Sequence, residues 1–387
     1  MREKPVIPVG IVYSQSGPYA RIGRQALAGA MRAIEAVNVR DDLGFRLEPH
    51  LRDPAGNSAR YASAALELIR EHKCRHILGA ITSSSRKDML PVLDRSESLL
   101  WYAFPYEGFE VSDHVLYLGA TANQHILPLF DYVLPRFGAA PFLVGSNYVW
   151  GWEINRIARE IVVMAGGDPV GECHLPLGDT DVAYVIEQIR ERRPDFVLSN
   201  LLGDSSLAFV HAYAELGRQD PDFAPSRRPI VSCNFCEVDA EAIGRDSAGI
   251  ITIAPFFADA AETPAIPISA ELGRLSQGFT GPHAAITVLA EAIAASGSDD
   301  PREVRRAATS NTVATLHGAL QLDARTGHCP MRPWIAMAEA DGRFQMLHRN
   351  VLDIAPDPYL MQPYPHLASL GHGRPTAPQP AKLRVMK

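Results

Sequence analysis

The sequence predicts an α/β fold with two similar lobes, each built on a parallel β-sheet. The chain has 387 residues, which exceeds the length at which a single hydrophobic core usually stops growing. Apolar runs of strand length alternate with segments of helical periodicity, a pattern typical of a parallel sheet that helices cover on both faces. The same alternation restarts near residue 141, so we expect a second lobe of the same kind.

Each lobe has its own series of expected elements, which begins with a strand and is Rossmann-like. In the first lobe, strands and helices alternate as residues 6–13, 24–39, 45–53, 58–71, 74–81, 86–94 and 99–104. In the second lobe they alternate as residues 141–146, 153–164, 170–176, 182–192, 195–203, 206–216, 229–235 and 249–256, with a short helix before the last strand.

A further helical segment, residues 282–295, has no partner strand next to it in the sequence. We expect it to return and cover the first lobe, so that the two lobes are joined by a hinge that the chain crosses more than once. The expected N-terminal lobe is 1–121 plus about 257–330, and the C-terminal lobe is 122–256 plus about 331–360. Residues 361–387 are a tail rich in Pro, Gly and His.

Composition and charge exclude several classes of function. The formal net charge is −7, whereas a nucleic-acid surface needs clustered Lys and Arg, so we expect no direct contact with nucleic acid. No apolar run reaches the roughly 18 to 20 residues of a membrane span, so we expect no membrane insertion. Five cysteines, an odd number, suit a reducing compartment better than a disulfide framework.

The first 20 residues do not match the pattern of a signal peptide. Their apolar stretch is short, contains Pro5 and Pro8, and lacks a small-residue cleavage site. We therefore expect a cytoplasmic location. A periplasmic location is the alternative if a signal peptide has been removed.

Two loops that come after expected strands carry clusters of aromatic residues. Ligands bind where loops leave the carboxyl ends of parallel strands. Core packing accounts equally well for any single ring, but two clusters that face each other across a cleft would form an apolar small-molecule pocket. The clusters are Trp101, Tyr102, Phe104, Tyr106 and Phe109 in the first lobe, and Tyr148, Trp150 and Trp152 in the second.

Ser83 begins a run of three serines after an apolar strand, and its hydroxyl has three interpretations. A hydrolase nucleophile normally lies in a Gly-x-Ser-x-Gly turn, which this sequence lacks, and the sequence does not identify the other members of a triad. Alternatively, the hydroxyl and the N–H groups after it donate to a ligand oxygen. The third interpretation is helix N-capping by Ser83 or Ser84.

Two groups of residues have spacings compatible with a metal site. Cys233 and Cys236 form a C-x-x-C motif without a second pair, so we interpret them as structural or pocket-lining thiols. His72 and His76 are four residues apart, but they straddle a helix end and a strand start, which breaks the helical face that a zinc motif needs. The sequence has neither a Walker A loop nor a G-x-G-x-x-G after a strand. We expect no metal and no cofactor.

Several segments resemble a known family. The opening GIVYSQSGPYA, with ALAGAMRAIEAVN after it, is similar to the start of type I periplasmic-binding-protein folds of the branched-chain amino acid, urea and amide class. The segments SSSRKDMLPVLDRSESLLWYAFPYEGFE, GATANQHILPL, VGSNYVWGWEINR and IAPFF resemble the amide receptors of this class, of the AmiC type. The resemblance covers nearly the whole chain, and PYEGFE is typical of the amide and urea branch. Receptors of this type are negative regulators of an aliphatic amidase operon.

The resemblance implies a receptor without catalytic residues that closes around a short-chain amide. A serine and a main-chain group that hold the ligand match Ser83 and Ile81. One tyrosine of the second lobe matches Tyr148, and Trp150 replaces another. The candidate ligand-binding residues are therefore Ile81, Thr82, Ser83, Tyr102, Phe104, Pro105, Tyr148, Trp150, Leu202, Asn234 and Phe235.

Two departures bear on the expected ligand. Phe104 stands where the amide receptors have a threonine, so a polar contact is lost and apolar bulk is gained, which argues against acetamide itself. The amino-acid receptors of the wider family use an acidic group for the ammonium of the ligand. Asn234 or Phe235 falls at that place here, which favours an uncharged ligand.

These expectations together describe a non-enzymatic receptor for a small neutral amide-like or urea-like ligand. The resemblance implies a negative regulator that acts through an antiterminator-type protein partner. The first alternative is the substrate-binding component of an ABC transporter for amides, urea or branched-chain amino acids. A more distant alternative is an amidase that uses Ser83. Formation of a homo-oligomer is left open.

Overall fold

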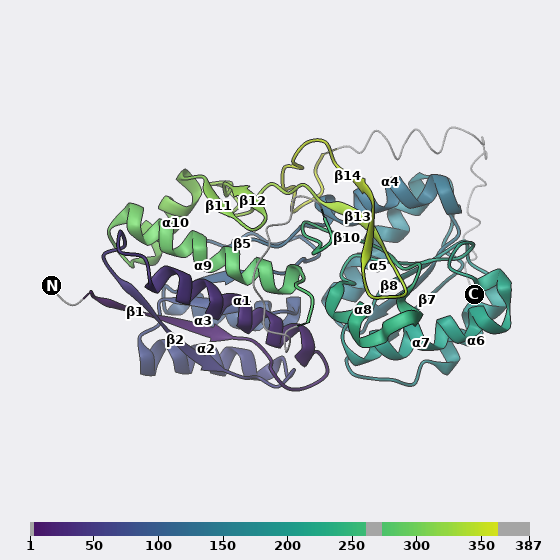
Figure 1. Ribbon diagram of the computed structural model, residues 1–387, viewed down its shortest axis with the longest axis horizontal. Helices are drawn as coiled ribbons and strands as arrows, with labels where there is room; N and C mark the ends of the chain where they lie inside the picture. Colours follow the sequence, from purple (N-terminus) through teal and green to yellow (C-terminus); the bar gives the residue numbers. More distant parts are fainter. Residues whose placement is uncertain (1–3, 261–272, 363–387) are drawn as a thin grey trace, which may run out of the picture.

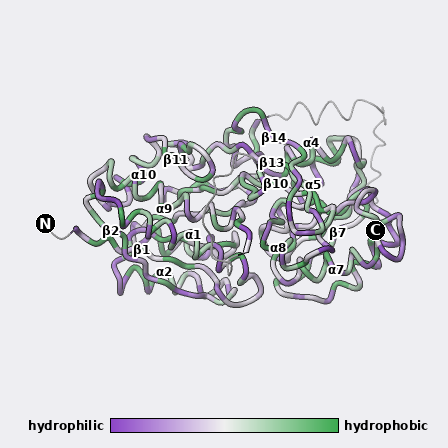
Figure 2. Tube along the Cα trace, viewed as in Figure 1, coloured by the Kyte–Doolittle hydropathy of each residue, from purple (hydrophilic) through white to green (hydrophobic). Residues whose placement is uncertain are grey.

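The protein has two lobes that lie side by side along its long axis, as the computed structural model shows (Figure 1). The structure describes residues 4–260 and 273–362, so nearly all of the expected tail at 361–387 lies outside the described residues. Figure 2 shows hydrophobic residues spread through both lobes, as two separate cores require. The predicted fold class of two α/β lobes with mostly parallel sheets is confirmed. Within the described ranges, no helix is long and apolar enough to span a membrane.

The sheet of the N-terminal lobe is parallel throughout, with strand order β2-β1-β3-β4-β5. Every residue of β3, β4 and β5 is buried, which is why these strands have continuous apolar sequences. The strands are β1 (Val6–Val12), β2 (Arg46–Arg52), β3 (His76–Gly79), β4 (Leu99–Tyr102) and β5 (Val115–Tyr117).

The sheet of the C-terminal lobe has strand order β14-β13-β10-β9-β8-β6-β7 and is parallel from β10 to β7. The pairs β10–β13 and β13–β14 are antiparallel, which the prediction of parallel sheets missed. Antiparallel strands need no crossover helix, so these strands lie outside the strand–helix alternation. The strands are β6 (Phe142–Ser146), β7 (Gly171–Leu175), β8 (Val197–Asn200), β9 (Ile230–Ser232), β10 (Ile251–Ala254), β13 (Trp334–Ala338) and β14 (Phe344–Arg349), and β11 (Val313–Thr315) with β12 (Gly318–Leu320) forms a separate pair.

Helices come after most strands, as the sequence pattern predicts. The sequence did not predict α4 or α10, and α4 contains Pro135, a residue that normally argues against a helix interior. The helices are α1 (Ala20–Asn38), α2 (Ala59–His72), α3 (Ser83–Arg95), α4 (Ile126–Phe137), α5 (Val149–Met164), α6 (Ala183–Arg192), α7 (Asp204–Gln219), α8 (Glu237–Ile243), α9 (Gln277–Ser296) and α10 (Pro301–Ser310), with short 3-10 turns η1 (Ala122–Gln124), η2 (Pro221–Phe223) and η3 (Gly244–Ser247).

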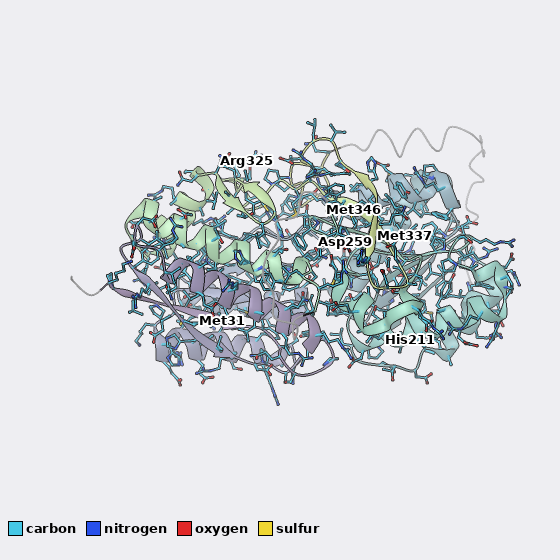
Figure 3. The ribbon with its side chains drawn as sticks, viewed as in Figure 1. Met31, His211, Asp259, Arg325, Met337 and Met346 are labelled. Carbon is cyan, nitrogen blue, oxygen red and sulfur yellow. The ribbon has the colours of Figure 1, made fainter. Side chains whose placement is uncertain are left out.

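The chain passes between the lobes more than once, as expected. Helix α9 returns to the N-terminal lobe and packs against α1 (Figure 1). Gly29 permits this close approach, because a Cβ there would lie 2.1 Å from the Phe279 carbonyl oxygen. The chain then returns to the second sheet, where the Phe344 N–H of β14 donates to Asp259, labelled in Figure 3, at 3.0 Å.

The two lobes are closed on one another at the rim of the cleft. The Asp204 N–H donates to the Pro18 carbonyl oxygen at 3.0 Å, and the Arg21 guanidinium pairs with the Asp204 carboxylate at 3.1 Å. Gly203 has a φ of +63°, and a Cβ there would lie 2.0 Å from the Pro18 carbonyl oxygen. The closed contact therefore requires glycine at residue 203.

We expect Gly203→Ala to hold the lobes apart, because its methyl group occupies the place of the Pro18 carbonyl in the closed form. Small-angle X-ray scattering should show a larger radius of gyration than for the native protein. Gly244→Ala is the matched control, since Gly244 has a φ of +67° and nothing within 4 Å of an added Cβ. Both variants should lose about 1 to 3 kcal/mol of stability through backbone strain. Equal radii of gyration for the two variants would contradict the closed contact.

Candidate ligand-binding site

A small cavity lies between the lobes, at the carboxyl ends of strands from both sheets. A depression on the C-terminal lobe belongs to that lobe alone, whereas residues of both lobes meet in the cleft. The cavity is lined by Ile22, Ile81, Ser83, Phe104, Pro105, Tyr148, Trp150, Leu202, Asn234, Cys236 and Gln277.

Thr82, Tyr102 and Phe235 are the candidate residues that do not line the cavity. Thr82 has an extended backbone and is the N-cap of α3, because its Oγ1 accepts a hydrogen bond from the Ser85 N–H at 3.3 Å. Capping therefore falls to Thr82 rather than to Ser83 or Ser84. The Ser83 side chain, in the first turn of α3, is left to face the cavity.

The Ser83 hydroxyl donates to the Glu107 carboxylate, with 2.5 Å between Oγ and Oε2. Both residues are buried. The expectation was that this hydroxyl donates to a ligand oxygen, but in the structure its hydrogen is engaged by Glu107. With its hydrogen engaged, the Ser83 oxygen can accept a hydrogen bond from a ligand.

Arg86 carries a guanidinium that is completely buried. Its Nε donates to Glu110 Oε1 at 2.7 Å, and its Nη2 lies 3.4 Å from Glu107 Oε1. Lys87 Nζ, which is partly exposed, lies 2.8 Å from Glu110 Oε2. Two cations and two carboxylates therefore balance one another directly behind Ser83. The sequence search missed this buried charge cluster of Arg86, Lys87, Glu107 and Glu110.

The charge cluster lowers the pKa of the Glu110 carboxyl group. Burial alone would raise the pKa of this carboxyl group, but the Arg86 guanidinium and the Lys87 ammonium outweigh burial and lower the pKa of Glu110 to about 2. The Tyr117 hydroxyl also donates to Glu110 Oε1 at 2.8 Å. Glu110 is therefore ionised at neutral pH and holds its two cations in place.

Tyr102 stands behind the cavity wall rather than on it. Its hydroxyl donates to the Ile81 carbonyl oxygen at 2.9 Å, and its ring lies against the Arg86 guanidinium, 4.6 Å from ring centroid to Cζ. The hydrogen bond occupies one of the two lone pairs of the Ile81 carbonyl, the main-chain group that the resemblance assigns to the ligand. Tyr102 thus holds the lining residue Ile81 in place but does not itself line the cavity.

The aromatic residues that reach the cavity are fewer than the two clusters in the sequence. Phe104 lines it and packs edge-to-face on Tyr13, with 6.2 Å between ring centroids. Tyr148 and Trp150 line it from the second lobe. In contrast, Trp101 and Tyr106 are buried in the first lobe, and Phe109 and Trp152 are 39% and 50% exposed.

The remaining wall of the second lobe comes from two loops that bond to each other. The Asn234 side-chain NH₂ donates to the Leu201 carbonyl oxygen at 2.9 Å, and the Leu202 N–H donates to Ser146 Oγ at 3.2 Å. Phe235 points into the core of the lobe, where its ring lies 6.3 Å from that of Phe344. Asn234 and Leu202 therefore line the cavity, whereas Phe235 supports it.

Three lining residues were not among the candidates: Ile22, Cys236 and Gln277. Cys236 belongs to the loop CNFCE, which comes after an expected strand, so its position was a usable signal. Ile22 lies on α1 and Gln277 at the start of α9, and neither comes directly after a strand. The rule that ligands bind at strand ends could not identify them.

The two candidate metal groups are occupied by other contacts. The His72 ring stacks on that of His50 at 4.0 Å, and His76 Nε2 lies 3.1 Å from the Asp299 carbonyl oxygen. Cys233 and Cys236 are both buried free thiols. Among the described residues, no group of three or more His, Cys, Asp and Glu is arranged to hold a metal ion.

Ser83 lacks the partners of a hydrolase nucleophile. The Ser83 hydroxyl donates to the Glu107 carboxylate, and its oxygen lies 3.4 Å from the Arg86 guanidinium, so neither of these contacts involves a histidine. A triad requires a histidine that accepts the serine proton and then delivers it to the leaving group. The arrangement at Ser83 therefore favours ligand binding over acyl transfer.

We expect Glu110→Gln to destabilise the protein at pH 7 by roughly 2 to 4 kcal/mol, because it removes a buried ion pair with Arg86. The pKa of Glu110 is lower in the folded state than in the unfolded state. Its contribution to stability is therefore complete above about pH 5 and is lost as the pH falls toward about 2.

Urea unfolding between pH 7 and pH 2.5 measures this dependence. The difference between native protein and Glu110→Gln should shrink as the pH falls through this window. The exposed Glu187, which pairs with Arg190 at 3.2 Å, supplies the control variant Glu187→Gln, which should leave the free energy of unfolding within about 0.5 kcal/mol at every pH. A difference that is independent of pH would contradict the assigned ion pair.

Comparison with known proteins gives both a family and a fold. A family model described as "Periplasmic binding protein domain" matches residues 7–364. An ABC-transporter solute-binding protein from R. palustris, solved with 4-hydroxybenzoate, has 20% sequence identity and a TM-score of 0.80, over 92% of this chain and 100% of that chain. Another, from Rhodopseudomonas palustris BisB5 with 3,4-dihydroxybenzoic acid, has 18% identity and a TM-score of 0.77, over 91% and 99%.

A third similar structure is the branched-chain amino acid transporter substrate-binding protein LivJ from Streptococcus pneumoniae, in complex with isoleucine. It has 16% identity and a TM-score of 0.75, over 90% of this chain and 100% of that chain. At such identities the similarity shows the fold alone, and the family match does not single out the amide branch. Because that match covers most of the sequence and the two lobes have the same architecture, the chain belongs to the periplasmic binding protein family.

Proposed function

We propose that this protein is a solute-binding protein that encloses a small, flat, uncharged ligand between its two lobes. The observation that carries the proposal is the composition of the cavity wall, where no charged residue of the described chain takes part. The nearby charges of the buried cluster are paired with one another. A ligand carboxylate or ammonium would therefore lose its hydration without gaining a partner of opposite charge.

Glu237, next to the lining residue Cys236, supports the same conclusion. Its carboxyl group is buried, and Oε1 accepts the Ala258 N–H at 2.8 Å. Burial raises the pKa of Glu237 to about 8, so the group is largely neutral at pH 7. It does not supply the negative charge that an amino-acid ammonium needs.

The polar groups of the first lobe suit an amide-like or urea-like end of the ligand. The Ser83 oxygen accepts a hydrogen bond, because its own hydrogen is donated to Glu107. The N–H groups of Ser83 and Ser84, at the start of α3, have no carbonyl partner within the helix and can donate, whereas the Ser85 N–H is donated to Thr82 Oγ1. An amide has an N–H donor next to a carbonyl acceptor. Its N–H can donate to the Ser83 oxygen, and its carbonyl oxygen can accept from the N–H groups at the start of α3.

The wall also favours a planar, apolar body. Phe104, Tyr148 and Trp150 contribute rings, and Ile22, Ile81 and Leu202 contribute aliphatic side chains. Aromatic faces pack well on flat molecules. Benzamide, which combines an uncharged amide with a ring, is thus a better probe of this cavity than acetamide.

The similar solved structures support a role in ABC transport and a periplasmic location more than regulation in the cytoplasm. They are described as transporter components in complex with benzoates or an amino acid. The expected antiterminator-type partner has no support from these comparisons. We therefore propose delivery of the ligand to a permease as the role of the closed form.

Titration calorimetry with benzamide, acetamide, urea, benzoate and leucine tests the ligand class. We expect benzamide to bind best and to be recovered intact. Ser83→Ala should weaken benzamide binding by about 10-fold or more, because a buried hydrogen-bond partner is removed. Ser84→Ala is the control, since Ser84 does not line the cavity. Binding of leucine or benzoate alone would refute the uncharged-ligand proposal.

A second prediction concerns the Phe104 ring. Phe104→Thr should shift the preference toward shorter, more polar amides by about 1 to 3 kcal/mol, because it replaces apolar bulk with a hydroxyl. The measured quantity is the ratio of the dissociation constants of benzamide and acetamide. Phe109→Thr, at a residue outside the cavity, should leave this ratio unchanged. The same ratio in Phe104→Thr and native protein would mean that the ring does not select the ligand.

A further inference from the structure

Gln277 contributes a side-chain amide to the cavity from the start of helix α9, which does not come directly after a strand. It is the first residue of α9, next to the N-cap Ser276, whose Oγ accepts the Gly278 N–H at 3.0 Å. Ser276 Oγ also donates to Gln25 Oε1 at 2.6 Å, which ties this end of α9 to α1. Gln277 is only 8% exposed and lines the cavity.

The side-chain amide of Gln277 has no hydrogen-bond partner in the described part of the chain, although it can donate two hydrogens and accept at its oxygen. Three other polar side chains of the wall do have partners: Ser83 donates to Glu107, Asn234 to Leu201, and Cys236 to Asp239. Gln277 therefore has unused hydrogen-bonding capacity inside the cavity.

Ser83 and Gln277 reach the cavity from opposite faces of the first sheet. The chain moves from β1 to β2 in one direction and from β2 through β3 to β4 in the other. Right-handed crossovers then place α1 on one face and α2 and α3 on the other. Helix α9 packs against α1, whereas α3 packs against α2 (Figure 1). The two side chains therefore enter the cavity from different helices, Ser83 from α3 and Gln277 from α9.

We propose that Gln277 binds a second, uncharged polar group at the end of the ligand that lies away from Ser83. The ligand class is then a short, rigid molecule with a hydrogen-bonding group at each end and a flat apolar middle that lies along Phe104. A para-substituted aromatic amide has this chemistry. This inference rests on the proposed function and specifies its ligand.

The probes are benzamide and 4-hydroxybenzamide, which differ only in the distal hydroxyl group. In calorimetry with the native protein, 4-hydroxybenzamide should bind at least about 10-fold more tightly, since a matched buried hydrogen bond discriminates strongly. Gln277→Leu should abolish this preference while changing benzamide affinity less than about 3-fold. Gln277→Glu keeps an acceptor for the ligand hydroxyl and should retain the preference for 4-hydroxybenzamide. Gln188→Leu, at a residue outside the cavity, is the control.

Equal affinities of native protein for the two probes, or an unchanged preference in Gln277→Leu, would overturn the role of Gln277. In that case benzamide would still bind and depend on Ser83, so the proposed function would stand. If the native protein binds neither probe, both the proposed function and the role of Gln277 are refuted.

Discussion

The buried guanidinium of Arg86 is the constraint on which the rest of the site depends. A buried charge is strongly unfavourable unless it is paired and fully hydrogen-bonded. Here Glu107 and Glu110 pair with it, and the rings of Tyr102 and Tyr106 lie 4.6 and 4.5 Å from Cζ. The pairing holds the start of α3 against the loop after β4. These are the two segments that form the first wall of the cavity.

The charge cluster also reaches the hinge. The ring centroid of Tyr106 lies 5.7 Å from that of His328, and the Tyr117 ring stacks on His328 at 4.2 Å between centroids. His328 lies between β12 and β13, and the Tyr117 N–H donates to the neighbouring Gly327 carbonyl oxygen at 2.8 Å. Burial lowers the pKa of His328 to about 4, so its ring is neutral and adds no charge beside Arg86. One crossing of the hinge is thus packed onto the groups that position Ser83.

Features that depend on local pattern could be predicted from the sequence. The apolar runs indicated the parallel strands. The rule that ligands bind at the carboxyl ends of parallel strands indicated four residues that line the cavity: Ser83, Phe104, Tyr148 and Trp150. Local pattern could not show that Arg86 is buried, because SSSRKD is typical of a solvated helix start. Its carboxylate partners lie 21 and 24 residues away, and only the fold brings them together. Gln277 was missed because it does not come directly after a strand.

Both lobes contribute to the cavity, so ligand binding and lobe closure are thermodynamically coupled. A ligand that contacts Ser83 in one lobe and Trp150 in the other gains most of its contacts only in the closed form. It can shift the population toward closure only by its difference in affinity for the two forms. The rim contacts of Asp204 with Pro18 and Arg21 are few and exposed, so they bias closure weakly. A bound ligand therefore supplies most of the stability of the closed form, and a partner that recognises the closed rim would bind the loaded protein more tightly than the empty one.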